Sequence, residues 1–200
     1  LTLDHLRQIH DRVREALADP EIAGVVVTHG TDTLEETAFY LDLCVPAGAP
    51  IVLTGAMRTA SEPGYDGYAN ITESIRVAAA DEARGRGALV VLNDQIHAAR
   101  WASKTHTNAP ETFASPHRGR LGRAYGRQIA FYCPAFHGPV LEGGGLAPDV
   151  ELLKACVGMG PDMFRLLVES GKRGIVIESL GAGRVPPAWL PHVEDAVRRG

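Results

Sequence analysis

The feature that most constrains the fold is a short apolar run, residues 24–27 (Gly-Val-Val-Val), followed directly by Thr-His-Gly-Thr-Asp-Thr at residues 28–33. Successive valines are typical of a strand that is covered on both faces of a sheet. Gly30 allows the backbone after such a strand to turn tightly or to approach a ligand closely. Open α/β sheets bind ligands at the carboxyl ends of their strands, in the loops that lead into the next helix. The run therefore predicts a parallel sheet in which Thr31 and Asp32 face a cleft.

The segment after this loop is expected to form a helix. Thr33 and Glu36 have the spacing of a capping box, in which each side chain accepts a hydrogen bond from the other residue's backbone N–H. One stripe of this helix carries apolar residues: Leu34, Ala38, Leu41 and Val45. Thr and Asp are ordinary helix-capping residues, which is the competing interpretation of Thr31 and Asp32. Because Thr33 already occupies the capping position, the functional and the structural interpretation both stay open.

Short apolar runs alternate with amphipathic segments along the first half of the chain. The runs are bounded by Gly, Pro or Asp and predict strands at residues 24–28, 51–55 and 88–92. The amphipathic segments predict helices: the opening segment with Leu6, Ile9, Val13 and Leu17, then residues 34–45 and about 68–82. Such alternation predicts an α/β fold, a parallel sheet flanked by helices.

Residues 93–127 show no regular pattern. A stretch of this length inside a compact domain is usually functional or disordered, and its aromatic and apolar residues favour a functional role. Residues 128–133 predict another strand. We therefore expect an N-terminal α/β catalytic-core domain over residues 1–133.

A Pro- and Gly-rich segment, residues 134–148 with Gly143-Gly144-Gly145, is expected to be a linker. Residues 149–200 then form a second, smaller and partial (truncated) α/β domain. Its expected strands and helices alternate: residues 150–157, 161–170, 174–179 and 187–199. Two strands and two helices make a small core, so this unit is expected to continue beyond Gly200 or to pack on a partner.

The composition excludes several classes of partner. The net charge of -4 leaves no electrostatic footprint for nucleic acid. A local basic run, Arg118, Arg120, Arg123 and Arg127, indicates a solvated loop or, as an alternative, an anion or subunit contact. No run approaches the ~18 apolar residues of a membrane span, so no membrane contact is expected.

Cysteine usage bears on the compartment. Cys44, Cys133 and Cys156 are widely spaced and include no C-x-x-C pair, which favours buried free thiols in a reducing, cytoplasmic compartment. Leu1 is not a start methionine, so we expect that a segment normally precedes it, and the missing targeting signal carries little weight.

Lys104 is the second candidate for chemistry. Lysine is rare here, since Lys and Arg together number 20 and only Lys104, Lys154 and Lys172 are lysines. A desolvated ammonium can lose its proton, whereas a guanidinium cannot, so Lys104 is a candidate proton shuttle. The alternative is an ordinary exposed lysine. With Thr31 and Asp32 it could form a hydroxyl–ammonium–carboxylate relay, although sequence spacing alone does not show that the three meet.

Other motifs are weaker. Residues 181–186 (Gly-Ala-Gly-Arg-Val-Pro) begin like a dinucleotide fingerprint but have Pro186 where the third glycine belongs, which favours a turn. Four histidines lack helical metal-ligand spacing and are interpreted as loop residues, with metal binding as the minor alternative: His97, His106, His117 and His137.

Several blocks of the chain together resemble a known family. Residues 25–43, VVVTHGTDTLEETAFYLDL, closely resemble the second signature of the bacterial-type L-asparaginase/glutaminase family. Further blocks follow in the same order: residues 52–58, Asp66-Gly67 with Asn70, and residues 90–94 leading to residues 104–107. The resemblance covers about residues 4–125 and is looser from Val150 onward.

The resemblance implies an amidohydrolase that converts the side-chain amide of L-asparagine, or of L-glutamine, to the acid and ammonia. Thr31 would be the second of two catalytic threonines, partnered by Lys104 and Asp32. Asp32 would also hold the α-ammonium group of this small amino-acid substrate, and Gly30 and Ala56 would line its pocket. The family implies no metal or organic cofactor and a homodimer or homotetramer with sites at subunit contacts.

The sequence departs from the family pattern in its first catalytic loop. The Thr-Gly-Gly-Thr turn with the first, nucleophilic threonine would precede Leu1, and the following serine-containing loop has no match here. The asparagine that a neighbouring subunit would supply is not evident at residues 158–160. We therefore expect little turnover from residues 1–200 alone. A non-catalytic amino-acid-binding or structural homologue, and a subunit of a tRNA-dependent amidotransferase, stay open as alternatives.

Overall fold

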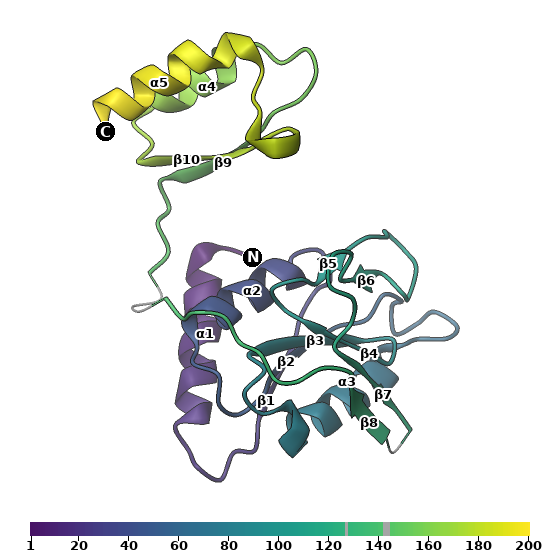
Figure 1. The fold of residues 1–200 in the computed structure, drawn as a ribbon. Coiled ribbons are helices and arrows are strands. Elements are labelled where there is room, and N and C mark those ends of the chain that lie inside the picture. Colours follow the sequence, from purple (N-terminus) through teal and green to yellow (C-terminus); the bar gives the residue numbers. More distant parts are fainter. Residues whose placement is uncertain (127, 142–144) are drawn as a thin grey trace. The chain divides into compact units, whose positions relative to one another are not determined.

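The structure, a computed structural model, describes residues 1–126, 128–141 and 145–200. It divides into two compact units, Leu1–Gly144 and Gly145–Gly200, each of which is described by itself (Figure 1). Arg127 of the basic run, and Gly143 and Gly144 of the expected linker, lie outside the described residues.

The first unit is built on a six-stranded sheet with the order β1-β2-β3-β4-β7-β8. The first strands are parallel: β1 (Val25–Thr28), β2 (Ile51–Thr54) and β3 (Ala88–Leu92). The others are antiparallel: β4 (Gln95–Ala98), β7 (Gly122–Tyr125) and β8 (Gln128–Phe131). The predicted α/β class is confirmed, but the sheet is mixed and only its first half is parallel.

The prediction that residues 93–127 have no regular structure is wrong in part, because β4 and β7 lie within this range. Asn93 and Asp94 have positive φ angles of 50° and 61° and form a two-residue turn that folds β4 back onto β3. Asn and Asp tolerate this left-handed conformation, which the tightest hairpin turns require. A second small pair, β5 (Ser103–Lys104) and β6 (Phe113–Ala114), also lies in this stretch.

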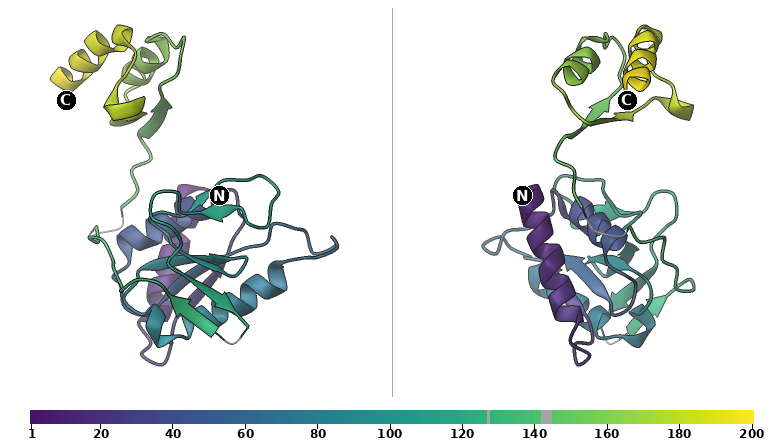
Figure 2. Two further views of the ribbon diagram at one scale, coloured as in Figure 1. Left: turned by 45° about the vertical axis from the view of Figure 1, so that its right-hand side comes forward. Right: turned by 90° about the vertical axis from the view of Figure 1, so that its left-hand side faces the viewer.

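Helices cover both faces of the sheet (Figures 1 and 2). On one face α1 (Leu3–Leu17) and α2 (Leu34–Cys44) pack against alternate strand residues, including Leu53 and Val90. On the other face α3 (Gly67–Ala78), followed by the short η1 (Asp81–Ala83), packs against the intervening positions. This alternation of side chains places an apolar core on each face of the parallel strands.

The predicted capping box at the start of α2 is wrong. Thr33 precedes the helix as expected, but its side chain makes no capping hydrogen bond. Its backbone, at φ −123° and ψ 16°, lies outside the extended region from which a side chain reaches back to the first turn. A capping box does form at α1, between Thr2 and His5.

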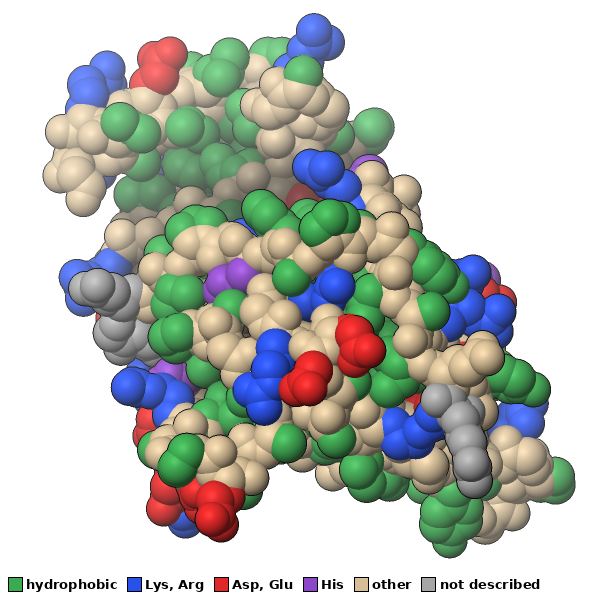
Figure 3. Space-filling view, turned by 60° about the horizontal axis from the view of Figure 1, so that its bottom comes forward, with side chains coloured by type: hydrophobic (Ala, Val, Ile, Leu, Met, Phe, Trp, Pro, Cys, Tyr) green, Lys and Arg blue, Asp and Glu red, His purple; other side chains and the backbone are tan. Residues whose placement is uncertain are grey.

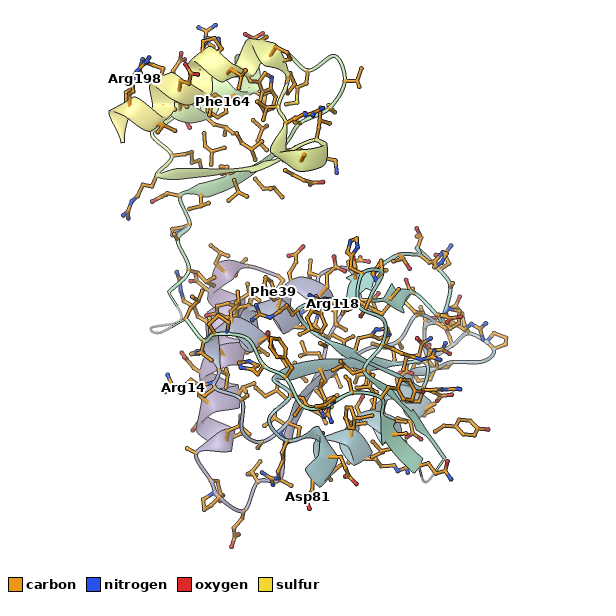
Figure 4. All side chains as sticks on the ribbon, viewed as in Figure 1. Arg14, Phe39, Asp81, Arg118, Phe164 and Arg198 are labelled. Atoms are coloured by element: carbon orange, nitrogen blue, oxygen red, sulfur yellow. The ribbon has the colours of Figure 1, made fainter. Side chains whose placement is uncertain are left out.

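The second unit pairs β9 (Val150–Lys154) and β10 (Gly174–Glu178) in parallel. Two helices, α4 (Asp162–Glu169) and α5 (Leu190–Arg199), cover one face of this pair around Phe164 and the fully buried Trp189 (Figure 4). The residues after β10 form two single turns, η2 (Gly181–Gly183) and η3 (Pro187–Trp189). The turn that was predicted at residues 181–186 is thus confirmed.

On the face in Figure 3, basic and acidic side chains are interspersed instead of forming a patch of one sign.

The cysteines are free, but Cys133 and Cys156 are exposed and Cys44 is partly buried, so the prediction of buried thiols is wrong for two of them. Within the described ranges, no helix is long and apolar enough to cross a bilayer.

Candidate active site

Three of the predicted site residues meet at the carboxyl end of β1. The Lys104 Nζ atom lies 3.0 Å from Thr31 Oγ1 and 2.6 Å from Asp32 Oδ1. Lys104 comes from β5, more than 70 residues along the chain from the other two residues, so only tertiary structure brings them together. We call these three residues the lysine cluster.

The first turn of α2 holds the lysine in place. The backbone N–H of Lys104 donates a hydrogen bond to Glu35 Oε2, and its strand partner in β6 is Phe113. The Lys104 side chain is therefore mostly enclosed, with 17 % of its surface exposed. Sequence reasoning missed Glu35, because nothing in the sequence ties this position to a residue in β5.

Asp32 stands in solvent beside this enclosed lysine, with 93 % of its side chain exposed. The hydrogen bond from Lys104 and its positive charge lower the pKa of the Asp32 carboxyl group below its ordinary value. The carboxylate therefore stays ionised and keeps oxygen lone pairs free for a further donor.

Gly55, just after β2, lets the loops after β1 and β2 touch. A Cβ atom at this position would lie 2.5 Å from the His29 carbonyl oxygen and 3.2 Å from Thr31 Cγ2. The His29 N–H donates to the Thr54 carbonyl oxygen at 2.8 Å, and the His29 ring contacts Thr37 of α2 at 3.0 Å. His29 is thus held by both β2 and α2, and a side chain at Gly55 would clash with its carbonyl oxygen and crowd Thr31.

Asp66 and Asn70, at the start of α3, join the neighbouring loops. Asp66 accepts hydrogen bonds from the backbone N–H groups of Met57 and Arg58, at 3.0–3.1 Å. Asn70 donates to the Gly55 carbonyl oxygen at 2.9 Å and accepts from the Asn93 N–H at 3.0 Å. The loops after β2 and β3 are therefore fixed relative to each other.

Opposing effects act on the Asp66 carboxyl group. Burial by itself raises its pKa, but the backbone N–H donors, with Asn70, outweigh burial and lower the pKa overall. No sequence pattern gives Asp66 and Asn70 a role, because their hydrogen bonds depend on the path of the loops.

A cleft of ≈ 320 Å³ lies at the carboxyl ends of β1 and β2. Gly30 and Ala56, which were expected to line a pocket, both border it, together with Tyr65 and Ile71. Thr31 and Asp32 do not line this cleft but directly follow Gly30 in the chain, so the lysine cluster is its neighbour.

Two of the four predicted loop histidines lie elsewhere, in contacts of their own. His97 is buried and its Nδ1 atom lies 2.9 Å from Ser115 Oγ, whereas His137 lies against Asp42 at the far end of α2. Among the residues with a described position, no group of three or more His, Cys, Asp or Glu side chains could hold a metal ion.

Comparison with known proteins decides the family. Residues 1–136 match the model of the asparaginase N-terminal domain, and residues 149–200 match the glutaminase/asparaginase C-terminal domain. The chain belongs to the asparaginase family. The predicted family resemblance is therefore confirmed, including its looser C-terminal part.

Curated asparaginases are similar over nearly the whole chain. A probable L-asparaginase of Deinococcus radiodurans is 41% identical over 197 residues, which is 96% of this chain and 60% of that protein. L-asparaginase 2-1 of Saccharomyces cerevisiae is 35% identical over 196 residues, 92% of this chain and 53% of that protein. L-asparaginase of Bacillus licheniformis is 33% identical over 200 residues, 100% of this chain and 62% of that protein. The chain thus spans between about half and three-fifths of the length of these relatives.

Proposed function

We propose that this chain is part of an amidohydrolase that hydrolyses the side-chain amide of L-asparagine, or of L-glutamine, to the acid and ammonia. The observation that carries the proposal is the position of Lys104 Nζ, within hydrogen-bond distance of both Thr31 Oγ1 and Asp32 Oδ1. Membership of the asparaginase family and the names of the relatives support the same reaction.

In this proposal the lysine cluster moves a proton. Lys104 acts as the general base that takes the proton of the Thr31 hydroxyl or of a water molecule held by it, which makes that oxygen a nucleophile. Asp32 stabilises the ammonium ion that results. Attack by a threonine hydroxyl, with its proton passed to the amide nitrogen, expels ammonia and leaves an ester, which one water molecule then hydrolyses to the acid and the free hydroxyl. Attack by the activated water itself gives the acid and ammonia directly, so either route consumes one water molecule in each turnover.

The substrate binds next to this cluster. The exposed, ionised carboxylate of Asp32 fits the α-ammonium group of an amino acid. Gly30 and Ala56 border the neighbouring cleft. Because Gly30 has no side chain and Ala56 has only a methyl group, a small substrate can approach the backbone there. No metal or organic cofactor takes part in the proposed reaction.

The first, nucleophilic threonine is proposed to come from a segment outside residues 1–200. Support comes from β1, which forms an edge of the described sheet, with its valines only partly buried. A groove of ≈ 830 Å³ lies between β1 and α1, with Ile9 and Val13 among its apolar lining residues and Asp11 and Arg12 among its charged ones. An edge strand beside such a groove fits the addition of a further strand.

We also infer the domain limits and the setting of the enzyme. The family matches at residues 1–136 and 149–200 support a catalytic-core domain over residues 1–133, a linker over 134–148 and a partial C-terminal domain over 149–200. The free thiols support a reducing, cytoplasmic compartment. A homodimer or homotetramer is proposed from the family resemblance.

The test measures ammonia release from L-asparagine by the natural full-length protein that contains these residues. Lys104→Met should lower kcat by about 10³-fold, because it removes the general base while leaving the fold intact. Lys154→Met is the matched control, since Lys154 forms an exposed ion pair with Glu178 in the second unit. The control should leave kcat unchanged.

Two results would contradict the proposal. One is full activity of Lys104→Met. The other is saturable calorimetric binding of L-aspartate without ammonia release from either amide, which would favour the amino-acid-binding alternative.

A further inference from the structure

A second cavity, of ≈ 580 Å³, lies at the carboxyl end of α2, away from the lysine cluster. Its volume falls in the range of about 300–1,000 Å³ that is typical of small-molecule sites. We call it the arginine pocket and define it by its basic and aromatic lining residues: Arg86, Arg100, Arg118, Arg120, Trp101 and Phe136.

The lining carries more positive than negative charge. Of the residues with a described position, Asp42 is the only acidic one that lines it, and it pairs with Arg100, whose Nη2 atom lies 3.1 Å from Asp42 Oδ2. Four guanidinium groups and one carboxylate leave a net charge of three positive units, which belong to Arg86, Arg118 and Arg120. Within the part of the chain that the structure describes, none of these three has a carboxylate partner.

Arg86 is the most informative of the three, because only 8% of its surface is exposed. Its guanidinium group donates to the carbonyl oxygens of Glu82 and Cys133 at 2.6 and 2.9 Å and lies 3.9 Å from the centre of the Phe131 ring. These partners satisfy hydrogen bonds but do not neutralise the charge. A buried charge without a counter-ion is costly, so an anion in the pocket would relieve it.

Aromatic side chains form one wall of the pocket. The rings of Trp101 and Phe136 are nearly parallel, with an interplanar angle of 8° and centroids 6.2 Å apart. The guanidinium group of Arg118 lies 5.3 Å from the centre of the Trp101 ring. Flat apolar faces beside a guanidinium group suit a ligand that has a planar ring next to its charge.

The pocket is held open by fixed contacts and is not a gap between loose segments. His137 Nε2 lies 3.0 Å from the Asp42 carbonyl oxygen, and the Leu141 N–H donates to the Leu43 carbonyl oxygen at 2.7 Å. A Cβ atom at Gly138 would lie 2.5 Å from the guanidinium carbon of Arg100. The segment that carries Phe136 is therefore fastened to the end of α2.

We propose that the arginine pocket binds an organic phosphate with a planar ring, a ligand of the nucleotide class. Arg118 and Arg120 are exposed, so they can reach the phosphate, and the Trp101–Phe136 wall takes the ring. This site does not share a side chain with the lysine cluster. If the site binds a phosphate, an anion is the contact partner of Arg118 and Arg120, as the alternative interpretation of the basic run expects.

The test compares three probes on the full chain by calorimetry: AMP, inorganic phosphate and adenosine. AMP should bind at least about tenfold more tightly than either of the others, because it alone combines charge and ring. AMP should also quench Trp101 fluorescence, whereas the fully buried Trp189 should not respond. Higher salt should weaken the binding.

Variants at exposed positions locate the site without risk to the fold. Arg118→Ala and Arg120→Ala should each weaken AMP binding by about tenfold. Arg123→Ala is the matched control, because Arg123 is exposed on β7 and does not line the pocket. No saturable AMP binding, equal affinity for AMP and either simpler probe, or an equal effect of Arg123→Ala would overturn the proposal.

Discussion

The two ends of α2 carry the same kind of ion pair in opposite surroundings. At the amino end, Asp32 pairs with Lys104 and keeps 93 % of its side chain exposed. At the carboxyl end, Asp42 pairs with Arg100 and keeps only 5 % exposed. Asp42 also accepts from the Ala88 N–H at 3.1 Å and lies 3.4 Å from His137 Nε2. The difference teaches that the buried pair serves the fold, whereas the exposed pair leaves its carboxylate free for a ligand.

The physical reason is the cost of leaving a charge unpaired. In water an exposed carboxylate loses little when its partner is removed. In the interior, loss of one partner leaves the other charge without compensation. Stability should therefore depend strongly on Asp42 and hardly at all on Asp32.

The largest expected effect is that of Asp42→Ala. Removing this carboxylate leaves Arg100 and the Ala88 N–H without their acceptor and should lower the free energy of unfolding by about 3–5 kcal/mol. Urea denaturation measures the change, and Asp32→Ala is the control, whose midpoint should stay at the wild-type value. Equal midpoints for the two variants would break the comparison.

Burial should also make stability depend on the protonation of His97, a buried group without an ion-pair partner. This dependence is measured through pH. Burial, helped by the charge of Arg120, lowers the pKa of folded His97 from 6.5 to about 4. Between these values the unfolded chain binds more protons than the folded protein, so stability is complete above about pH 6.5 and is lost as the pH falls toward 4. The loss should be on the order of 3 kcal/mol.

Urea denaturation across this pH range, for the wild type and for His97→Gln, measures this contribution. The variant lacks the titrating group, so its stability should fall less on acidification. An identical pH profile for both proteins would show that His97 does not carry the effect.

A smaller effect is expected from Glu35→Ala, which tests how the exposed pair is positioned. Glu35 accepts the hydrogen bond of the Lys104 backbone N–H, so its loss should cost about 1–3 kcal/mol of stability. The Lys104 amide proton should also shift upfield in an NMR spectrum. Glu35→Gln keeps an acceptor and should shift that signal less. An unmoved Lys104 signal in both variants would argue against this contact.

The smallest effect concerns the Asp32 carboxyl group alone. Because Lys104 lowers its pKa, Lys104→Met should raise that pKa toward the ordinary value, as followed by NMR titration. High salt should reduce the difference between the two proteins, since the Asp32 carboxylate is exposed to solvent. A pKa that is the same in both proteins at low salt would mean that the contact does not form in solution.

Local patterns predicted the parallel half of the sheet well. Short apolar runs predicted β1, β2 and β3, and the apolar stripe of α2 predicted its packing face, since burial of such residues leaves few alternatives. Prediction from apolar patterns failed where the backbone conformation of one or two residues decides the path of the chain. The two-residue turn at Asn93 and Asp94 was overlooked, and the cap expected at Thr33 depends on a backbone conformation that the loop does not adopt.

The sequence by itself determined the family, the α/β core and the presence of a hydroxyl and a carboxylate after the first strand. Only the tertiary structure decided that Lys104 reaches both of them, that Glu35 holds Lys104, and that Asp42 is buried against Arg100. Short-range patterns record which residues are buried, because burial depends on helix and strand periods. Contacts between side chains that are far apart in the chain depend instead on how loops close over the sheet, and no local period encodes that.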